Sequence, residues 1–455
     1  MKKKIVFICI AALPIAVVGI IVLFLFLRPS PEEAGLAPAI EATTPEPALA
    51  ELPPEPPPAS EPEPKPESVP PPEPAPEPEH ENAHVPGQNH EPEPEPQPAT
   101  DITDELTVSL SDGRQPATLL DRDYTTRLVF GQDKGITLNA TMDIHSLYLI
   151  WSLPPGQWTV SGAETQVFGE NGFIHEYVTL ASTAQELTIT LPQDGAALCD
   201  IYAFAEGTPP EWVQTWLPPL FQTDLLAFPT HADDEHLFFV GVLPYYAGER
   251  GYRVQVAYLT NHWNQPPRPH ELLNGLWAVG IRNYPIISGF NDRYAETLQQ
   301  ATNIYGFDNF VNFQVELIRR FRPYVVVGHD LNGEYGHGVH MLGAHALRAA
   351  VENAADSTWH TESYEQYGTW NTQKLYLHLY RENAIMMDWD IPLENFGGAT
   401  AYEMAVRGYE AHRSQHRWAF AVPRPGSVSG HRFGLVRSLV GEDVIGNDMF
   451  ENIVN

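Results

Sequence analysis

The chain has 455 residues, with 58 acidic residues against 26 lysines and arginines, and a formal net charge of −32 at pH 7. This acidic balance argues against nucleic acid and anionic membrane surfaces as partners, because both would repel the chain. The length is too great for one small core and suggests two or three domains. No feature of the sequence identifies a protein partner.

An uncharged apolar segment, residues 5–27, directly follows three lysines, Lys2–Lys4. At ~1.5 Å per residue in a helix, this segment is long enough to cross the ~30 Å hydrocarbon core of a bilayer. No small-residue cleavage site follows it. Residues 1–28 are therefore predicted to be a single-pass membrane anchor, with the lysines in the cytoplasm and the rest of the chain extracytoplasmic, at the cell surface. A cleaved signal peptide is the alternative.

Proline and glutamate dominate the next segment, residues 29–103, in runs such as "PPEPPPASEPEPKPE". Such a composition cannot bury a core, and its prolines and like charges keep the chain extended. We expect a disordered linker that holds the folded part away from the membrane. A disordered tail without a role would have the same composition.

Short runs of β-branched and aromatic residues, separated by turn residues, fill residues 104–208 and predict a β-sandwich of the jelly-roll type. The pattern resembles discoidin-like, galactose-binding-like modules, which implies that Tyr148, Trp151 and Trp158 could contact carbohydrate. Aromatic residues inside strands are more often part of the core. Cys199 has no partner outside the apolar segment and is expected to be a buried thiol. The expected strands are "LTVSL", "RLVFG", "GITLNA", "SLYLIWSL", "WTVSG", "HEYVTLA" and "ELTITL".

Strand and helix patterns alternate in residues 209–455, which predicts an α/β domain with a mostly parallel sheet and helices on both faces. Ligands of such sheets bind beyond the carboxyl ends of the strands. The polar segments 231–236 and 329–340 follow two of these ends. Strands are expected at "DLLAFPT", "YRVQVAYLT", "YPIISG", "YVVVGHD" and "QKLYLHLY", and helices around 234–247, 268–280, 292–320, 338–355 and 400–413.

The segment "HADDEH" places several charged side chains directly after an apolar strand, where uncompensated charge is costly. A cation would compensate it. His231 and Asp234 can converge on one metal ion, and one histidine of His337 and His340 can supply a third ligand while the other faces the open coordination position. Alternatively, the acidic residues cap a helix and either histidine belongs to the core.

Two segments in this order, "DLLAFPTHADDE" and "RPYVVVGHDLNGEYGHGVHMLGAHAL", resemble the paired motifs of the LmbE-like or PIG-L deacetylases. The resemblance covers about residues 222–440, including "RPHE", "WNTQKLYLHLY", "HRSQ" and "FGLVRS". It implies a Rossmann-like fold and zinc-dependent hydrolysis of N-acetyl groups, typically on molecules that contain N-acetylglucosamine (GlcNAc). By this resemblance the metal ligands are His231, Asp234 and His340, the general base is Asp233, the residue that assists at the developing oxyanion, if protonated, is His337, and the substrate pocket is lined by Arg268 and Tyr335.

The chain departs from the family pattern at two positions. Ala232 stands where the family usually has proline, and this change could loosen the turn. Val339 stands where an aspartate often precedes the last histidine, and the loss of that carboxylate could change the pKa of His337 and with it the role of this residue. Among the other polar residues, Glu235 is expected at the start of a helix or behind the ligands. The remaining histidines, expected at the surface or the pocket rim, are His236, His262 and His345, with His262 nearest to substrate.

The sequence thus predicts a multidomain protein: an anchor (1–28), a linker (29–103), a β-sandwich (104–208) and a Rossmann-like deacetylase domain (209–455). The expected activity is zinc-dependent N-deacetylation of a GlcNAc-containing glycan or glycoconjugate at the cell surface, with another divalent metal as an alternative to zinc. The alternatives are a non-catalytic surface glycan-binding protein and an amidohydrolase that acts on another N-acyl group.

Overall fold

The computed structural model describes residues 97–424 and 429–453. The predicted anchor and nearly all of the predicted linker lie outside these residues. Within the described part, no helix has both the length and the apolar character needed to cross a bilayer. All described residues fall within one compact unit, so the boundary between residues 208 and 209 stays a prediction.

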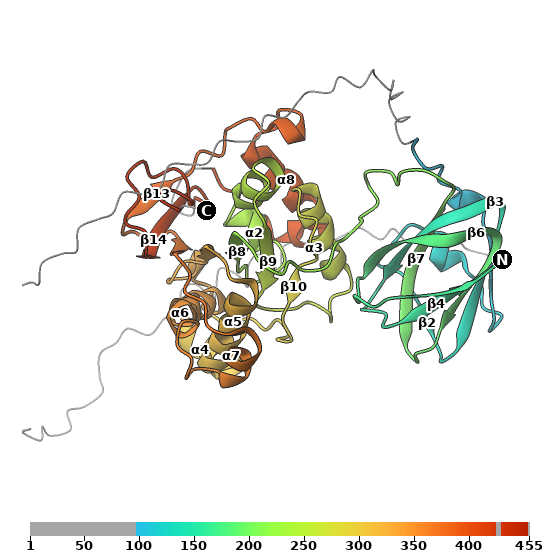
Figure 1. Cartoon of the computed structure of the whole chain (residues 1–455), viewed down its shortest axis with the longest axis horizontal. Helices are drawn as coiled ribbons and strands as arrows, with labels where there is room; N and C mark the ends of the chain where they lie inside the picture. Colours follow the sequence, from blue (N-terminus) through green and yellow to red (C-terminus); the bar gives the residue numbers. More distant parts are fainter. Residues whose placement is uncertain (1–96, 425–428, 454–455) are drawn as a thin grey trace, which may run out of the picture. The chain divides into compact units, whose positions relative to one another are not determined.

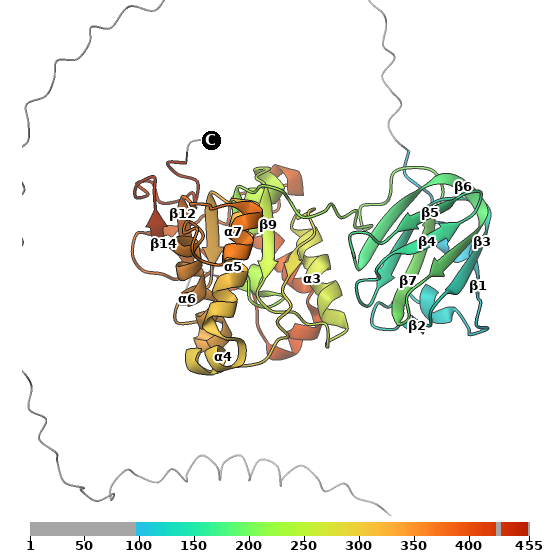
Figure 2. The ribbon, with the colours of Figure 1, turned by 60° about the horizontal axis from the view of Figure 1, so that its bottom comes forward.

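Residues 107–204 form an antiparallel sheet of seven strands in the order β2-β7-β3-β6-β4-β5, with β1 paired to β3 (Figures 1 and 2). Two short 3₁₀ helices, Thr103–Glu105 and Ala117–Leu120, flank β1. The strands are β1 (Thr107–Leu110), β2 (Leu128–Phe130), β3 (Lys134–Trp151), β4 (Trp158–Ser161), β5 (Thr165–Phe168), β6 (His175–Leu191) and β7 (Ala196–Phe204).

Two strands of this sheet are longer than the sequence indicated. The runs "GITLNA" and "SLYLIWSL" are parts of the single strand β3, and "HEYVTLA" and "ELTITL" are parts of β6. The register between β3 and β6 shifts between Asn139 and Ser146. Irregularities of this kind bend a strand without ending it. The residues between the two runs of each pair therefore lie within a strand. All seven strands join into one hydrogen-bonded sheet.

The aromatic residues considered for carbohydrate contact belong to the core. Trp151 and Trp158 are at most 1% exposed and Tyr148 is 2% exposed. The Trp158 indole N–H donates to the Glu176 carboxylate at 2.8 Å, which satisfies its polar atom inside the core. The interpretation of these residues as ligand contacts is therefore wrong. Cys199 is buried as predicted, and burial raises the pKa of its thiol to about 12.

A second seven-stranded sheet forms in residues 225–438, in the order β10-β9-β8-β11-β12-β14-β13. The first five strands in this order are parallel, as predicted, and β14 and β13 add an antiparallel edge. Antiparallel edge strands are common on otherwise parallel sheets. The strands are β8 (Leu225–Ala227), β9 (Val254–Tyr258), β10 (Ile286–Ile287), β11 (Val325–Gly328), β12 (Lys374–His378), β13 (Ala384–Met386) and β14 (Arg432–Ser438).

Helices cover both faces of this second sheet, as predicted (Figure 1). Along β8, Leu225 and Ala227 share one apolar core with residues of α3 and α8. Leu226, which points to the opposite face, shares another core with residues of α5 and α6. The helices are α2 (Asp234–Leu237), α3 (Pro267–Ala278), α4 (Leu298–Tyr305), α5 (Phe307–Phe321), α6 (Gly338–Asn353), α7 (Thr361–Tyr367) and α8 (Ala401–Glu410).

Two predicted helices are interrupted. The helix expected at 234–247 is the short α2, which ends at Leu237, followed by a π-helical segment, Pro244–Glu249; between them Val240 takes a positive φ of 40°. The helix expected at 292–320 breaks into α4 and α5 at Gly306, whose φ is 78°. The helix α7 was not predicted.

A substitution at Gly275 in α3 can test how tightly α3 packs against His236 and His412. A Cβ atom at this position would lie 2.6 Å from His236 Nε2 and 2.9 Å from His412 Nε2. Although alanine favours a helix by about 1 kcal/mol over glycine, we expect Gly275→Ala to lower the free energy of unfolding by about 1–3 kcal/mol through overpacking. Gly289→Ala, where a Cβ has no atom within 4 Å, is the control. Equal stability of the two variants in urea unfolding would contradict this packing.

Candidate metal-binding active site

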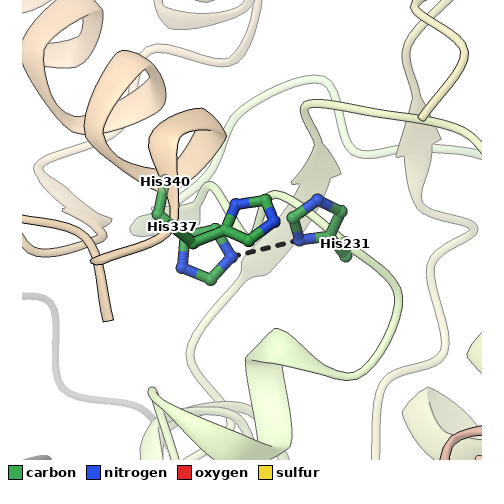
Figure 3. Close-up of side chains that lie close together, drawn as sticks. All are labelled: His231, His337 and His340. Carbon is green, nitrogen blue, oxygen red and sulfur yellow. Dashed lines mark hydrogen bonds between the residues drawn. The ribbon is translucent and has the colours of Figure 1, made fainter. Parts of the chain in front are cut away.

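The site lies where two neighbouring parallel strands end. β8 and β11 pair in parallel, so the segments that follow them meet at the same edge of the sheet. His231 follows β8, and His337 and His340 lie at the start of α6, after β11 (Figure 3). The structure thus brings together the two polar segments that the sequence singled out.

Three predicted ligand atoms form a nearly equilateral triangle. His231 Nδ1 lies 3.2 Å from Asp234 Oδ2 and 3.1 Å from His340 Nε2, and the latter two atoms are 3.2 Å apart. All three side chains are buried. Zinc bonds of ~2.0–2.1 Å in tetrahedral geometry place ligand atoms about 3.3 Å apart. The triangle therefore has the size of one face of a zinc coordination tetrahedron.

Glu334, which the sequence reasoning missed, sets the proton positions around this triangle. Its buried carboxylate accepts Nδ1–H bonds from His340 at 2.7 Å, from His329 at 2.9 Å and from His378 at 2.6 Å. These histidines hold the pKa of Glu334 well below its usual range, although burial acts in the opposite direction. With its Nδ1 protonated, His340 presents the unprotonated Nε2 to the triangle.

Asp292 orients His231 as Glu334 orients His340, by pairing with the ring nitrogen that faces away from the triangle. Its carboxylate lies 3.3 Å from His231 Nε2, on the side of the ring away from the triangle. If Nε2 donates to Asp292, the lone pair of His231 Nδ1 faces that of His340 Nε2 and the Asp234 carboxylate. Three electron-rich atoms at 3.1–3.2 Å repel one another unless a cation lies among them. The donor set therefore fits a divalent metal ion.

His329 also lies beside Asp234, with 3.4 Å between His329 Nε2 and Asp234 Oδ2. This nitrogen accepts the backbone N–H of Thr230 at 3.0 Å, so its lone pair is already used. His329 thus orients the carboxylate Glu334 and the turn after β8, and the triangle does not need it as a ligand.

The predicted ligands carry strongly shifted pKa values. Burial opposes the charged form of Asp234, yet His340 and His231 together lower its pKa well below the usual range. Burial also opposes protonation of His231, but Asp234 and Asp292 raise its pKa to about 9. The pocket therefore favours an extra positive charge, whether proton or metal ion.

Asp233 lies next to the triangle without being part of it. Its carboxylate pairs with the Arg268 guanidinium at 3.3 Å, and its backbone N–H donates to Glu235 at 3.0 Å. Burial raises the pKa of Asp233 to about 8, Asp234 and Glu235 add to this shift, and Arg268 opposes it. Its backbone φ of 124° is one that non-glycine residues rarely adopt, and such strain is concentrated at functional sites.

His337 and Tyr335 face the same space from the start of α6. Burial, followed by the charges of His231 and His340, lowers the pKa of His337 to about 3. The pocket therefore favours the neutral form of this ring, whereas the expectation from the sequence considered the protonated form. Tyr335 is 55% exposed and has a positive φ of 47°.

The two departures from the family pattern have different consequences here. The backbone N–H of Ala232 donates to His262 Nε2 at 3.3 Å, a bond that proline could not make. Val339, at the position where the family often has aspartate, is fully buried in the apolar core with α5 and α6. This position therefore offers no carboxylate to His337. His337 Nδ1 has no hydrogen-bond partner among the described residues.

A cavity of about 360 Å³ opens over the triangle. His262 lines this cavity, as predicted, whereas His236 is fully buried away from it and was wrongly expected at the surface or rim. Arg268 and Tyr335 line it as predicted. The lining residues that the sequence reasoning missed are Leu237, Phe238, Gln265, Asp292, Tyr294, Gln415, Arg417, Trp418 and Phe420.

No protein-family model matches the chain. A stretch of 69 residues, 15% of the chain, is 41% identical to a 1D-myo-inositol 2-acetamido-2-deoxy-alpha-D-glucopyranoside deacetylase of Rhodococcus erythropolis and covers 22% of that protein. A protein of the same name from Geodermatophilus obscurus is 29% identical over 115 residues, 23% of this chain and 38% of that protein. The resemblance to sugar N-deacetylases is confirmed by these relatives, although the chain spans well under half of their length.

Solved structures also resemble parts of the chain. The N,N'-diacetylchitobiose deacetylase from Pyrococcus horikoshii is 13% identical over 44% of this chain and 76% of that chain, with a TM-score of 0.33. CpGH89CBM32-6 from Clostridium perfringens is 16% identical over 24% of this chain and 100% of that chain, with a TM-score of 0.20. Scores this low do not support a conclusion about function.

Glu334 provides a test of how the site is organised. Replacing it by glutamine puts an amide N–H₂ group where imidazole N–H groups now find an acceptor, so His340 loses its fixed orientation. We expect Glu334→Gln to weaken zinc binding by ~10–100-fold, the usual effect of losing a partner behind a metal ligand. Competition with a chromophoric chelator measures this change. Asp330→Asn is the control, because within the described residues the hydrogen bonds to this nearby carboxylate come from Asn332. An equal loss in both variants would contradict the role of Glu334.

Proposed function

We propose that the chain is a zinc-dependent N-deacetylase that hydrolyses the acetamido group of a GlcNAc-type sugar. The observation that carries this proposal is the triangle of His231, Asp234 and His340 beside an open cavity, next to which lies the carboxylate of Asp233, paired with Arg268 and not part of the triangle. The relatives named as deacetylases of a 2-acetamido sugar support the substrate class. Another divalent metal could occupy the same ligands.

The zinc ion would be held by His231, Asp234 and His340, and it would supply Lewis-acid polarisation of the acetyl carbonyl and of a water molecule. Asp233 would accept the proton of the attacking water and then return it to the leaving amine. Arg268, which pairs with Asp233 and donates to the Ala232 carbonyl, would hold that carboxylate toward the cavity.

His337 would stabilise the oxyanion that forms on the acetyl oxygen. As a neutral ring it would donate an N–H rather than provide a positive charge, and preorganised donors of this kind stabilise the transition state more than the ground state. The exposed aromatic rings at the cavity rim, Tyr335, Tyr294 and Trp418, offer flat apolar surfaces to a sugar.

A non-catalytic glycan-binding protein is a weaker proposal. The aromatic residues of the first sheet that were considered for this role are buried. The cavity is lined by two of the proposed ligands, His231 and Asp234, and by the separate carboxylate of Asp233, which glycan binding alone does not require. An amidohydrolase for another N-acyl group would use the same residues, and only the size of the acyl pocket would differ.

The separate roles of the two aspartates give the sharpest test of the activity. We expect Asp234→Ala to lose bound zinc and activity together, because two ligands hold zinc poorly. Asp233→Asn should keep zinc and lose ~10²–10⁴-fold in turnover. His337→Ala should also keep zinc and lose ~10²–10³-fold. The measurements are zinc content and acetate release from GlcNAc-containing oligosaccharides.

Asp308→Asn, at an exposed position in the first turn of α5, is the control for these variants and should match the wild type in both measurements. If Asp233→Asn loses zinc while Asp234→Ala keeps it, the roles assigned to the aspartates are wrong. If the wild-type protein holds zinc but releases no acetate from any N-acetylated sugar, the deacetylase proposal fails.

The location of the enzyme is a separate proposal, supported by the apolar segment 5–27 and the Pro/Glu-rich segment after it. We propose that a single anchor holds the catalytic residues outside the cell, where a surface glycan is the substrate. Protease added to intact cells should then remove the folded part and leave a short membrane fragment. Full protection, with cleavage only after lysis, would place the folded part in the cytoplasm and contradict the proposal.

A further inference from the structure

A second cluster of possible metal ligands lies behind the catalytic turn. It consists of Glu235 and His236, both in α2, and His412, which follows α8. The three side chains have no exposed surface, and one ligand atom from each lies within 4.8 Å of the other two. Glu235 Oε1 is 3.3 Å from His236 Nε2 and 3.6 Å from His412 Nε2. No residue is shared with the triangle of His231, Asp234 and His340.

The polar atoms of this cluster are poorly satisfied by the protein. None of the four ring nitrogens of His236 and His412 makes a hydrogen bond to any described residue, and the same holds for Glu235 Oε1. Buried polar groups are rarely left in this state, because no hydrogen bond then offsets the loss of their contacts with water. A cation among these atoms would satisfy three of them at once.

Two helices are shaped to leave room for the imidazole rings. Gly275 of α3 and Gly408 of α8 face the rings, and a Cβ at either position would collide with His236.

We propose that Glu235, His236 and His412 bind a second divalent metal ion, with zinc as the ion best suited to two imidazoles and one carboxylate. The ion would have a structural role, since the side chains are closed off from solvent. The Glu235 carboxylate would offset one of the two charges of the ion, and the two imidazoles would donate nitrogen lone pairs to it.

This second ion would stabilise the active site from behind. The other oxygen of Glu235, Oε2, accepts the backbone N–H of Asp233 at 3.0 Å, so fixing Glu235 also fixes the strained turn that carries the proposed base. His412 directly precedes residues 413–418, and Gln415, Arg417 and Trp418 of that segment line the cavity. The ion would thus link the catalytic turn to one wall of the cavity.

The competing explanation is a metal-free network in which Glu235 is protonated and forms hydrogen bonds to the imidazoles and to the Tyr258 hydroxyl. Tyr258 lies close to Glu235, since burial and then Glu235 raise the pKa of the tyrosine. The two explanations differ in metal stoichiometry, which can be measured without any assay of activity.

The test is elemental analysis of the full chain, purified after expression with zinc. We expect about two zinc ions per chain in the wild type and about one in His236→Gln and in His412→Gln. His340→Gln should also retain about one zinc ion, because it loses the ion of the triangle and keeps the ion bound by Glu235, His236 and His412. His416→Gln, at an exposed position in the same segment as His412, is the control and should retain two. One zinc ion in the wild type that persists in His236→Gln would overturn the proposal.

Anomalous diffraction at the zinc edge from wild-type crystals decides the matter if a histidine variant does not fold. A peak among Glu235, His236 and His412 is the expected result, and its absence beside an occupied triangle overturns the second site while leaving the proposed deacetylase site intact. A peak at the second site with none at the triangle would instead support this inference and count against the proposed function.

Discussion

The buried carboxylate of Glu334 is the interaction on which the site depends. An ionised group without exposed surface costs several kcal/mol unless it is fully paired, and here three imidazole N–H groups pair it. Its partners His329, His340 and His378 come from the end of β11, from α6 and from β12. One carboxylate therefore ties three elements together and, by holding the proton of His340 on Nδ1, leaves Nε2 free to bind a cation.

The parallel sheet makes this arrangement possible, because β8, β11 and β12 are neighbours whose carboxyl ends open on one edge. Backbone strain is found at the same edge, where Asp233 and Tyr335 have positive φ values. Such conformations persist only where surrounding contacts enforce them. For Asp233 these contacts are the Arg268 guanidinium and the Glu235 carboxylate, both buried. The same buried contacts therefore make the turn at Asp233 rigid and hold its backbone in a strained conformation.

Sequence reasoning failed where local pattern and tertiary environment disagree. The runs "GITLNA" and "SLYLIWSL" were expected as two strands, but both lie in β3, whose length depends on pairing with β6. Trp151 could have been a surface contact or a core residue, and only the packing of the sheet decided for the core. Glu334 lies in "LNGEYGHG", a segment with the composition of an exposed loop. Nothing in that segment shows that three imidazoles, one of them from the distant strand β12, surround its carboxylate.

The sequence by itself determined the alternation of strands and helices in residues 209–455 and the two strand ends that carry His231 and His340, because hydrophobic periodicity and polar clusters are local properties of a chain. Only the tertiary structure decided which atoms converge. The bond from His340 to Glu334, the lowered pKa of His337 and the burial of His236 all depend on how side chains and helices are placed in space. Electrostatic energies inside a protein depend on distance and desolvation, and neither is encoded in the spacing of residues along the chain.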